Sequence, residues 1–365
     1  MVSKRAMAVG GLVPALVLTV GTGVASASPT PSGPTVIASG LNNPRQLAFG
    51  PDGTLYVADA GSGKVGATDT SGGCATGPEG GTVCAGNTGD VTAIGWPAAA
   101  SGQTARKVVS GLLSVADEGT GAGATGIDAI APGPYGTGVG IMTVVNPTIV
   151  PQSVAYQNGK VLSTVPGHAV VADVGTFTLA HPQPGHAPES DPYGITVVGT
   201  TGYVADAAGN TLLTVTPDGT VRQLTVFHYR HGDGSDGSYD AVPTAVTPGP
   251  YQGRQVLYVA DLGSLMPGAA NIYAVDPGTG AILHTWSGFT GLNGIAVDPA
   301  GTIYATSLFA PNPVGPPGAL VTIPAGGSPT ATPVPLPGGV AVRGGHVYVS
   351  EFSTVAGGGM VVRLH

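Results

Sequence analysis

Four acidic residues occupy the same place in similar segments of the sequence. Each follows a short apolar run and precedes a turn-forming stretch: Asp59, Asp206, Asp261 and Glu351. Carboxylate oxygens are the ligands that Ca²⁺ and other hard cations prefer. The same groups can instead accept hydrogen bonds from backbone N–H groups in the turn that follows. Because the feature recurs from segment to segment, we favour this capping role and keep a site for Ca²⁺ or another divalent cation as the alternative.

The two cysteines lie in one stretch rich in Gly and Thr, with nine residues between Cys74 and Cys84. In an exported protein, such a pair forms a disulfide. A metal site would need more ligands, and Glu79 is the acidic residue close to the pair in sequence. The sequence therefore predicts a Cys74–Cys84 disulfide.

A polar insertion from Phe227 to Asp240 contains two His, three Asp and two Tyr. Its Asp spacing does not fit an EF-hand loop. We interpret the insertion as a solvated loop, with a metal or ligand site as the alternative. The sequence contains neither a Gly-x-Ser-x-Gly nucleophile motif nor a Gly-rich phosphate loop with its Lys, so no catalytic residue is assigned.

The composition indicates an all-β protein. The 365 residues include 62 Gly and 33 Pro, and 42% of the chain is hydrophobic and lies in short runs between the glycines. This arrangement is typical of many short strands joined by tight turns. The net charge is −8 and only 9% of residues are charged, with no basic stripe, so we expect no nucleic-acid partner.

Six segments share one pattern: a small residue, an apolar run, a Gly-rich turn and a second apolar run. Third and fourth strands follow several of these pairs, as at residues 271–275 and 281–286. Four short strands in each repeat of about 40–50 residues are the signature of a β-propeller blade. The sequence therefore predicts a six-bladed β-propeller over residues 35–365, after a linker at 28–34.

The N-terminal strand is predicted to complete the last blade. Residues 36–41 repeat a sequence motif that ends a predicted fourth strand at 108–112 and again at 285–289. No blade precedes residues 36–41, and the last repeat stops after its third strand. Pairing of the two would cover an open sheet edge.

Four motifs resemble the ScyD/ScyE family of exported bacterial proteins. They are Gly40–Arg45, Asp191–Gly194, Ala241–Thr244 and Pro267–Tyr273. The resemblance implies a six-bladed propeller of the NHL/gluconolactonase-like type, and it implies no settled activity. The chain departs from the family pattern at Ser307, where an acidic residue often ends the second strand.

In a propeller, the first residues of the inner strands surround the upper mouth of the central channel. Alignment of the six repeats places these residues there: Arg45, Thr125, Tyr193, Thr244, Asn293 and Gly338. The resemblance implies a relationship to lactonases that hold a divalent cation at this mouth with carboxylates and asparagines. Among the six residues here, only Asn293 matches those ligand types.

We therefore predict a platform that binds a protein or small molecule through Arg45, Tyr193, Thr244 and Asn293. The alternatives are a metal-dependent hydrolase, lactonase or lyase that uses the four acidic residues, and a purely structural module.

The N-terminus predicts export. Lys4 and Arg5 precede an apolar run at residues 6–20, and Ala25-Ser26-Ala27 fits a signal-peptidase site. The run is shorter than the ~20 apolar residues that a membrane span requires. We expect a signal peptide of residues 1–27 and a secreted, monomeric protein with no transmembrane anchor.

Overall fold

The computed structural model describes residues 33–77, 80–95, 105–133, 138–165, 167–227, 230–231, 238–311, 314–315 and 317–364. The predicted signal peptide, Glu79 and most of the polar insertion at 228–240 lie outside these residues. No helix within the described ranges is long and apolar enough to cross a membrane.

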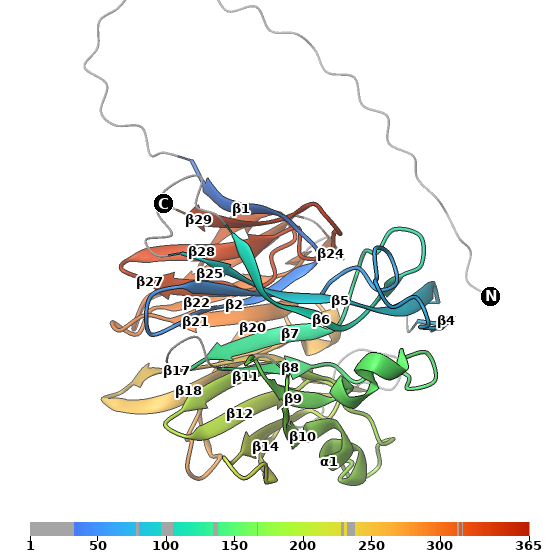
Figure 1. Cartoon of the computed structure of the whole chain (residues 1–365). Coiled ribbons are helices and arrows are strands. Elements are labelled where there is room, and N and C mark those ends of the chain that lie inside the picture. The colour runs from blue at the N-terminus through green and yellow to red at the C-terminus, as the bar shows by residue number, and fades with distance from the viewer. Residues whose placement is uncertain are drawn as a thin grey trace, which may run out of the picture. The chain divides into compact units, whose positions relative to one another are not determined.

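Six antiparallel sheets form the blades of a β-propeller (Figure 1), as the sequence predicted. Blade 1 contains β2 (Pro44–Phe49), β3 (Leu55–Asp59), β5 (Thr82–Ile94) and β6 (Arg106–Asp117), with the short β4 (Cys74–Thr76) beside β5. Blade 2 contains β7 (Ile127–Pro132), β8 (Gly138–Met142), β9 (Lys160–Ser163) and β10 (Val170–Asp173). Blade 3 contains β11 (Pro192–Val198), β12 (Thr201–Asp206), β13 (Thr211–Val215) and β14 (Val221–Val226).

The other three blades follow the same order. Blade 4 contains β17 (Pro243–Tyr251), β18 (Arg254–Asp261), β19 (Ala270–Val275) and β20 (Ile282–Phe289). Blade 5 contains β21 (Leu292–Val297), β22 (Ile303–Ser307), β25 (Gly318–Ile323) and β26 (Thr330–Val334). Blade 6 contains β27 (Val340–Arg343), β28 (His346–Glu351), β29 (Gly359–Leu364) and β1 (Thr35–Leu41).

Short elements lie in the connections between these strands. They are η2 (Gln152–Gln157), α1 (Val174–Ala180), η3 (Gly263–Leu265) and the small hairpins β15 (Arg230–His231) with β16 (Ser238–Tyr239) and β23 (Ala310–Pro311) with β24 (Val314–Gly315). Asp173 caps α1, because its carboxylate accepts the backbone N–H of Thr176.

The strand β1 forms the fourth strand of blade 6. It pairs antiparallel with β29, and Figure 1 shows the blue β1 beside the dark red β29. Ile37 and Leu41 of β1 are buried and pack in one cluster with Leu47 and Tyr348. The first and last strands of the propeller therefore share one sheet.

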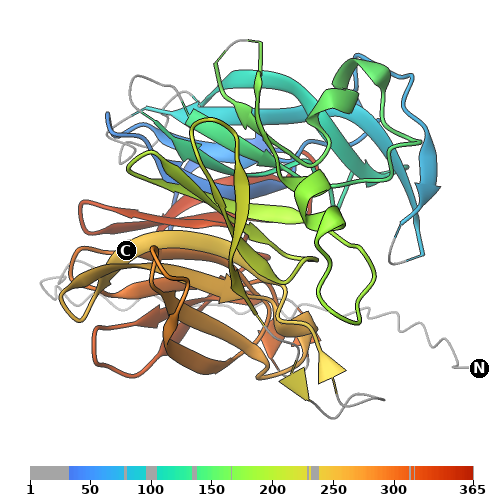
Figure 2. The same ribbon diagram turned by 90° about the horizontal axis from the view of Figure 1, so that it is seen from below.

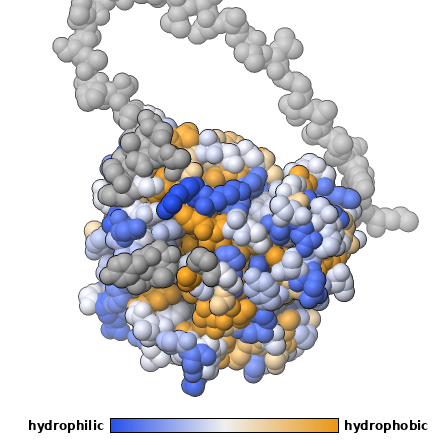
Figure 3. All heavy atoms as spheres, in the orientation of Figure 1, coloured by the Kyte–Doolittle hydropathy of each residue, from blue (hydrophilic) through white to orange (hydrophobic). Residues whose placement is uncertain are grey.

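Apolar side chains fill the spaces between blades. Between blades 4 and 5, for example, Tyr258 and Ile272 pack against Ile295 and Ile303. The inner strands approach one another closely: a Cβ at Gly194 would lie 2.7 Å from the carbonyl oxygen of Thr244 in the next blade. Only glycine fits such a contact. Outside, hydrophobic and hydrophilic residues are interspersed on the face shown in Figure 3.

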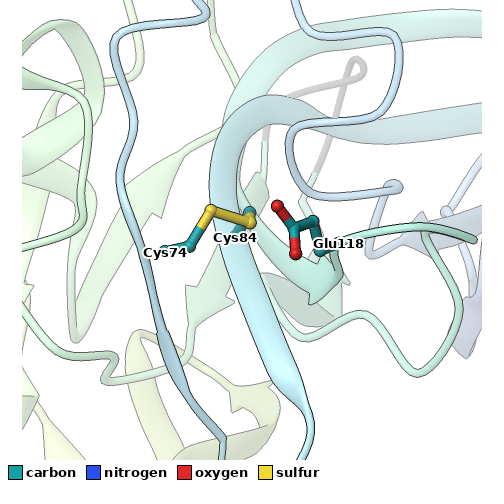
Figure 4. A group of neighbouring side chains, drawn as sticks. All are labelled: Cys74, Cys84 and Glu118. Carbon is teal, nitrogen blue, oxygen red and sulfur yellow. A yellow bond between two sulfur atoms is a disulfide. The ribbon is translucent and has the colours of Figure 1, made fainter.

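The predicted disulfide between Cys74 and Cys84 is confirmed. The two cysteines are directly opposite each other on β4 and β5, with their Cα atoms 4.1 Å apart. Glu118 lies beside the sulfur atoms (Figure 4). Among the residues that the structure describes, these three form the only group of three His, Cys, Asp or Glu whose ligand atoms lie within 4.8 Å of one another. Because both sulfur atoms are already in the disulfide, the group does not offer thiolate ligands.

Loss of this disulfide is expected to weaken the protein moderately. In the chain-entropy treatment, a closed loop of this length contributes about 2–3 kcal/mol. Chemical denaturation of the Cys74→Ser/Cys84→Ser variant should give a free energy of unfolding lower by that amount. The wild-type protein under reducing conditions should match the variant. Equal stability of the oxidised wild type and the variant would contradict the prediction.

Candidate functional site

Five inner strands carry a β-bulge at the same position. The pairing register shifts between Pro44 and Leu47, and at matching places in β7, β11, β17 and β21. The extra residues at or next to these shifts are Arg45, Asp128, Tyr193, Thr244 and Asn293. A bulge redirects the extra side chain, so a repeated bulge brings five dissimilar side chains to one end of the channel. We call this end, where the inner strands begin, the upper channel mouth.

The register corrects one sequence-based assignment. The alignment placed Thr125 in the ring, but β7 begins at Ile127, and the bulge residue of blade 2 is Asp128. Thr125 lies just before the strand, where its backbone pairs with Val115. Its hydroxyl donates to Oδ2 of Asp128 at 3.4 Å. The ring therefore contains a carboxylate that the sequence alignment missed.

Arg45 is the centre of a buried polar network. Its Nη1 donates to the hydroxyl of Tyr193 at 3.1 Å, and its Nη2 donates to the carbonyl of Ala124. Its Nε lies 3.6 Å from Oδ1 of Asp128. The guanidinium also lies over the Tyr193 ring, 5.9 Å from the ring centre. With the Arg45 side chain 11% exposed and that of Asp128 fully buried, the three residues form one desolvated group.

Burial dominates the electrostatics of the carboxylates in this group. Burial raises the pKa of Asp128 to about 8, although the charge of Arg45 opposes the shift. Burial also raises the pKa of Asp191 to about 6, and the nearby charge of Asp206 adds to the effect. The hydroxyl of Thr143 donates to Asp191 at 2.6 Å and favours its charged form. Titratable groups with pKa values near neutrality are typical of functional sites.

Thr244 and Asn293 stand on the other side of the ring and contact backbone groups. The hydroxyl of Thr244 lies 2.7 Å from the carbonyl of Leu292 in the next blade. The Asn293 amide nitrogen donates to the carbonyl of Pro337 at 2.8 Å. Gln46 reaches from blade 1 to the backbone carbonyl of Asn293. These contacts hold neighbouring inner strands together, so both residues also have a structural role.

Three of the four acidic candidates bind nearby backbone groups. Asp59 accepts the N–H of Asn42 at 2.9 Å. Asp206 accepts the N–H of Asp191 at 2.8 Å and of Gly209 at 3.0 Å.

Asp261 accepts the N–H of Asn271 at 2.6 Å and the hydroxyl of Tyr273 at 2.7 Å. Ser307, the fifth-blade equivalent, bonds instead to the carbonyl of Thr290. Each of these residues thus joins the end of its second strand to another part of its own blade or to the segment that precedes it.

Glu351 differs from the other three. It is only 7% exposed, and no hydrogen bond to its carboxylate is found among the described residues. Burial raises its pKa. Within the described ranges, no group of three carboxylate or His ligands forms around any of the four candidates. The structure therefore does not bring the acidic residues together as a set.

Divalent cations are accordingly expected to have little effect on stability. The carboxylates of Asp59, Asp206 and Asp261 already accept protein donors, so a cation would have to displace these bonds. Thermal melting of the mature protein should give the same midpoint with chelator and with millimolar Ca²⁺, Mg²⁺ or Zn²⁺. A tightly bound ion would instead add about 2.7 kcal/mol at a hundredfold excess over Kd, and the midpoint would rise.

Below the mouth, the channel continues between the inner strands. A cavity of about 280 Å³ is lined by all six inner strands, with Ile130, Ile195, Val246, Ile295 and Val340 among its walls. Gln46 lies on its lining and bonds across to blade 5.

No model of a known protein family matches the chain, and no curated protein matches it. Several solved structures are similar in fold. A structural-genomics protein of unknown function from Bacteroides thetaiotaomicron has a TM-score of 0.50 at 10% identity, over 91% of this chain and 75% of that one.

Two other similar structures are named for an activity. A candidate oxidoreductase (glucose dehydrogenase) from Thermus thermophilus has a TM-score of 0.49 at 16% identity, over 91% of this chain and 99% of that one. Virginiamycin B lyase from Staphylococcus aureus has a TM-score of 0.45 at 9% identity, over 89% and 95%. At such identities the likeness concerns the fold alone, and the predicted ScyD/ScyE relationship is not shown by these comparisons.

Proposed function

We propose that the protein is an exported binding protein that holds a small polar ligand at the upper channel mouth. The ligand would donate hydrogen bonds, as a hydroxyl or amino compound does. Export rests on the predicted signal peptide, and a relationship to the exported ScyD/ScyE proteins rests on the four motifs.

One observation carries the proposal. Oδ1 of Asn293 is a buried acceptor without a hydrogen bond among the described residues, and Oδ1 of Asp128 likewise has no hydrogen bond there, with the Nε of Arg45 3.6 Å away. Buried polar atoms nearly always have a partner, so such exceptions need an explanation. Both atoms belong to bulge residues, one in blade 2 and one in blade 5. A ligand that donates to them would remove the cost of leaving them unpaired.

Arg45 and Tyr193 complete the proposed contacts. Tyr193 is half-buried and presents both an aromatic face and a hydroxyl group. The guanidinium of Arg45 faces the carboxyl group of Asp128, and this contact orients both groups before a ligand binds. Thr244 contributes through its bond to Leu292, which positions the neighbouring strand and its Asn293.

A metal-dependent hydrolase, lactonase or lyase would need oxygen ligands directed into the channel. Asp59, Asp206 and Asp261 are engaged with backbone groups instead. No observation favours this second function, so we do not propose it.

The proposal is tested by thermal-shift screening of the mature protein against polyols, hexoses, amino acids and polyamines at millimolar concentration. We expect one class to raise the midpoint. Tyr193→Phe should reduce the affinity for that class about five- to tenfold, since it removes one hydrogen bond. Tyr156→Phe is the matched control, because Tyr156 is 43% exposed and lies in η2, outside the inner strands. No shift with any class would contradict the proposal, and so would an affinity unchanged in the Arg45→Ala/Tyr193→Ala variant.

A further inference from the structure

A second cavity lies between blades 4 and 5, at the ends of their inner strands that are remote from the upper channel mouth. Its volume is about 510 Å³. Its walls are the β17–β18, β21–β22 and β25–β26 turns together with the outer strand β20. Figure 2 shows the yellow-to-orange sheet of blade 4 beside the orange sheet of blade 5. The volume falls within the ~300–1,000 Å³ usual for small-ligand sites.

Four aromatic rings converge on one side of this cavity. Trp286 is central: Tyr258 stacks on it at 5.7 Å, and His284 meets it edge-on at 4.4 Å. Tyr251 also meets Trp286 edge-on at 5.7 Å and stacks with His284 at 5.8 Å. Tyr258 is buried, and its hydroxyl donates to the carbonyl of Pro250 at 2.8 Å. The buried Tyr258 thus supports an aromatic surface of which His284 is exposed and Trp286 half-buried.

Neutral polar groups surround the aromatic surface. Gln252 occupies the left-handed region, with a φ of 48°, in the tight turn between β17 and β18. Its side chain is exposed and donates from Nε2 to the Tyr251 hydroxyl at 3.2 Å, which leaves its amide oxygen available to a ligand. Gly301 and Gly326 of the two turns opposite also line the cavity, and the Gly301 N–H donates to the carbonyl of Asp298 at 2.9 Å.

The described lining residues of the cavity include no Asp, Glu, Lys or Arg. The nearest carboxylate in the β21–β22 turn, Asp298, accepts the N–H groups of Ala300 and Thr302, both at 2.9 Å, within its own turn. An ionic ligand would therefore find no counter-charge here, and it would lose its hydration without compensation.

We propose that this cavity binds a neutral carbohydrate. A sugar ring has an apolar C–H face that packs on an aromatic ring, whose negative face attracts the C–H dipoles. Around its edge the ring carries hydroxyl groups, which both donate and accept hydrogen bonds. The cavity has matching parts: an aromatic surface at Trp286 and His284, and neutral donors and acceptors at Gln252 and Tyr251.

A proline-rich peptide fits these groups less well. Such a peptide offers carbonyl acceptors and no N–H donors at its prolines, so it needs donors in the groove. The hydroxyl of Tyr258 is already used by Pro250. The carbohydrate uses the acceptors of the cavity as well as its donors, and it is the ligand that we commit to.

Tryptophan fluorescence provides the test. The chain has two tryptophans, Trp96 and Trp286, so emission in a Trp96→Phe background reports Trp286 alone. The mature protein is titrated with cellohexaose, laminarihexaose, xylohexaose, maltohexaose and chitohexaose, and separately with a polyproline decamer. We expect a saturable change with at least one glycan. His284→Ala should then weaken binding about tenfold, which corresponds to the loss of one ring contact.

Thr285→Ala is the matched control. Thr285 is the exposed neighbour of His284 on β20, and alternation along a strand turns it to the opposite face. Its replacement should leave the glycan affinity within about twofold of wild type. Three results would overturn the proposal: no binding of any of the five glycans, binding of polyproline only, or glycan binding that His284→Ala does not weaken more than Thr285→Ala.

Discussion

The free energy of unfolding is expected to fall between about pH 6 and pH 9, and replacement of Asp128 by Asn should abolish most of this fall. Burial raises the pKa of Asp128 to about 8 in the folded protein, whereas the ordinary pKa of an Asp side chain is 3.8. The folded state therefore holds a proton that the unfolded state has released. Stability from this group is fully present below the unfolded pKa and is lost as the pH rises through the folded pKa.

The expected size follows from the position of the folded pKa. Across this interval, Asp128 contributes a loss of about 3 kcal/mol in the free energy of unfolding. Asp59 adds a smaller loss, since burial and the charge of Asp90 raise its pKa to about 7. Asn has the shape of the protonated acid and does not titrate, so the Asp128→Asn variant retains the Asp59 part and the smaller parts of the other buried carboxylates, such as Asp191.

Urea denaturation at a series of pH values measures this effect. Asp276→Asn is the control, because Asp276 is exposed and hydrogen bonds from Thr279 and Gly278 lower its pKa. Its replacement should leave the decline between pH 6 and pH 9 unchanged. A wild-type protein whose stability rises over this interval would show that Arg45 keeps Asp128 ionised, and our account of the mouth would be wrong.

Loss of the strand β1 is expected to have the other large effect. Ile37 is 3% exposed and packs with Leu47 of blade 1 and Tyr348 of blade 6. Ile37→Ala should lower the free energy of unfolding by about 2–5 kcal/mol, because a cavity would remain between the first and last blades. Deletion of residues 33–41 should prevent cooperative folding, since it also exposes the whole edge of β29.

Val36→Ala is the matched control for the strand. Val36 is the neighbouring residue and is 46% exposed, so its replacement should change stability by less than about 0.5 kcal/mol. Chemical denaturation of both variants provides the comparison. Equal losses in the two variants, or a deletion variant that melts like wild type, would show that β1 contributes little to the fold.

The blade pattern could be predicted because it depends on local signals. Short apolar runs separated by turns such as Gly50-Pro51-Asp52-Gly53 recur along the chain and form the strands of the blades. The Cys74–Cys84 disulfide could be predicted for a similar reason, since the two residues are close in sequence.

Asp128 of the candidate site was missed because the repeats were aligned on the wrong residues. Ile127-Asp128-Ala129-Ile130 has the same order as Leu292-Asn293-Gly294-Ile295: apolar, polar, small, apolar. An alignment on that order would have placed Asp128 at the position equivalent to Asn293. Alignment on the turn residues before the strands selected Thr125 instead, because a one-residue bulge leaves no clear periodic signal.

The sequence by itself determined the all-β class, the six repeated blades and the disulfide, because each depends on residues that are neighbours in the chain. The tertiary structure decided where the functional groups point. Whether Asp59, Asp206 and Asp261 face the channel or their own blades depends on donors up to 17 residues away. The group of Arg45, Asp128 and Tyr193 joins three blades, and its raised pKa values arise from burial that no single segment provides. Long-range packing, rather than local pattern, created that site.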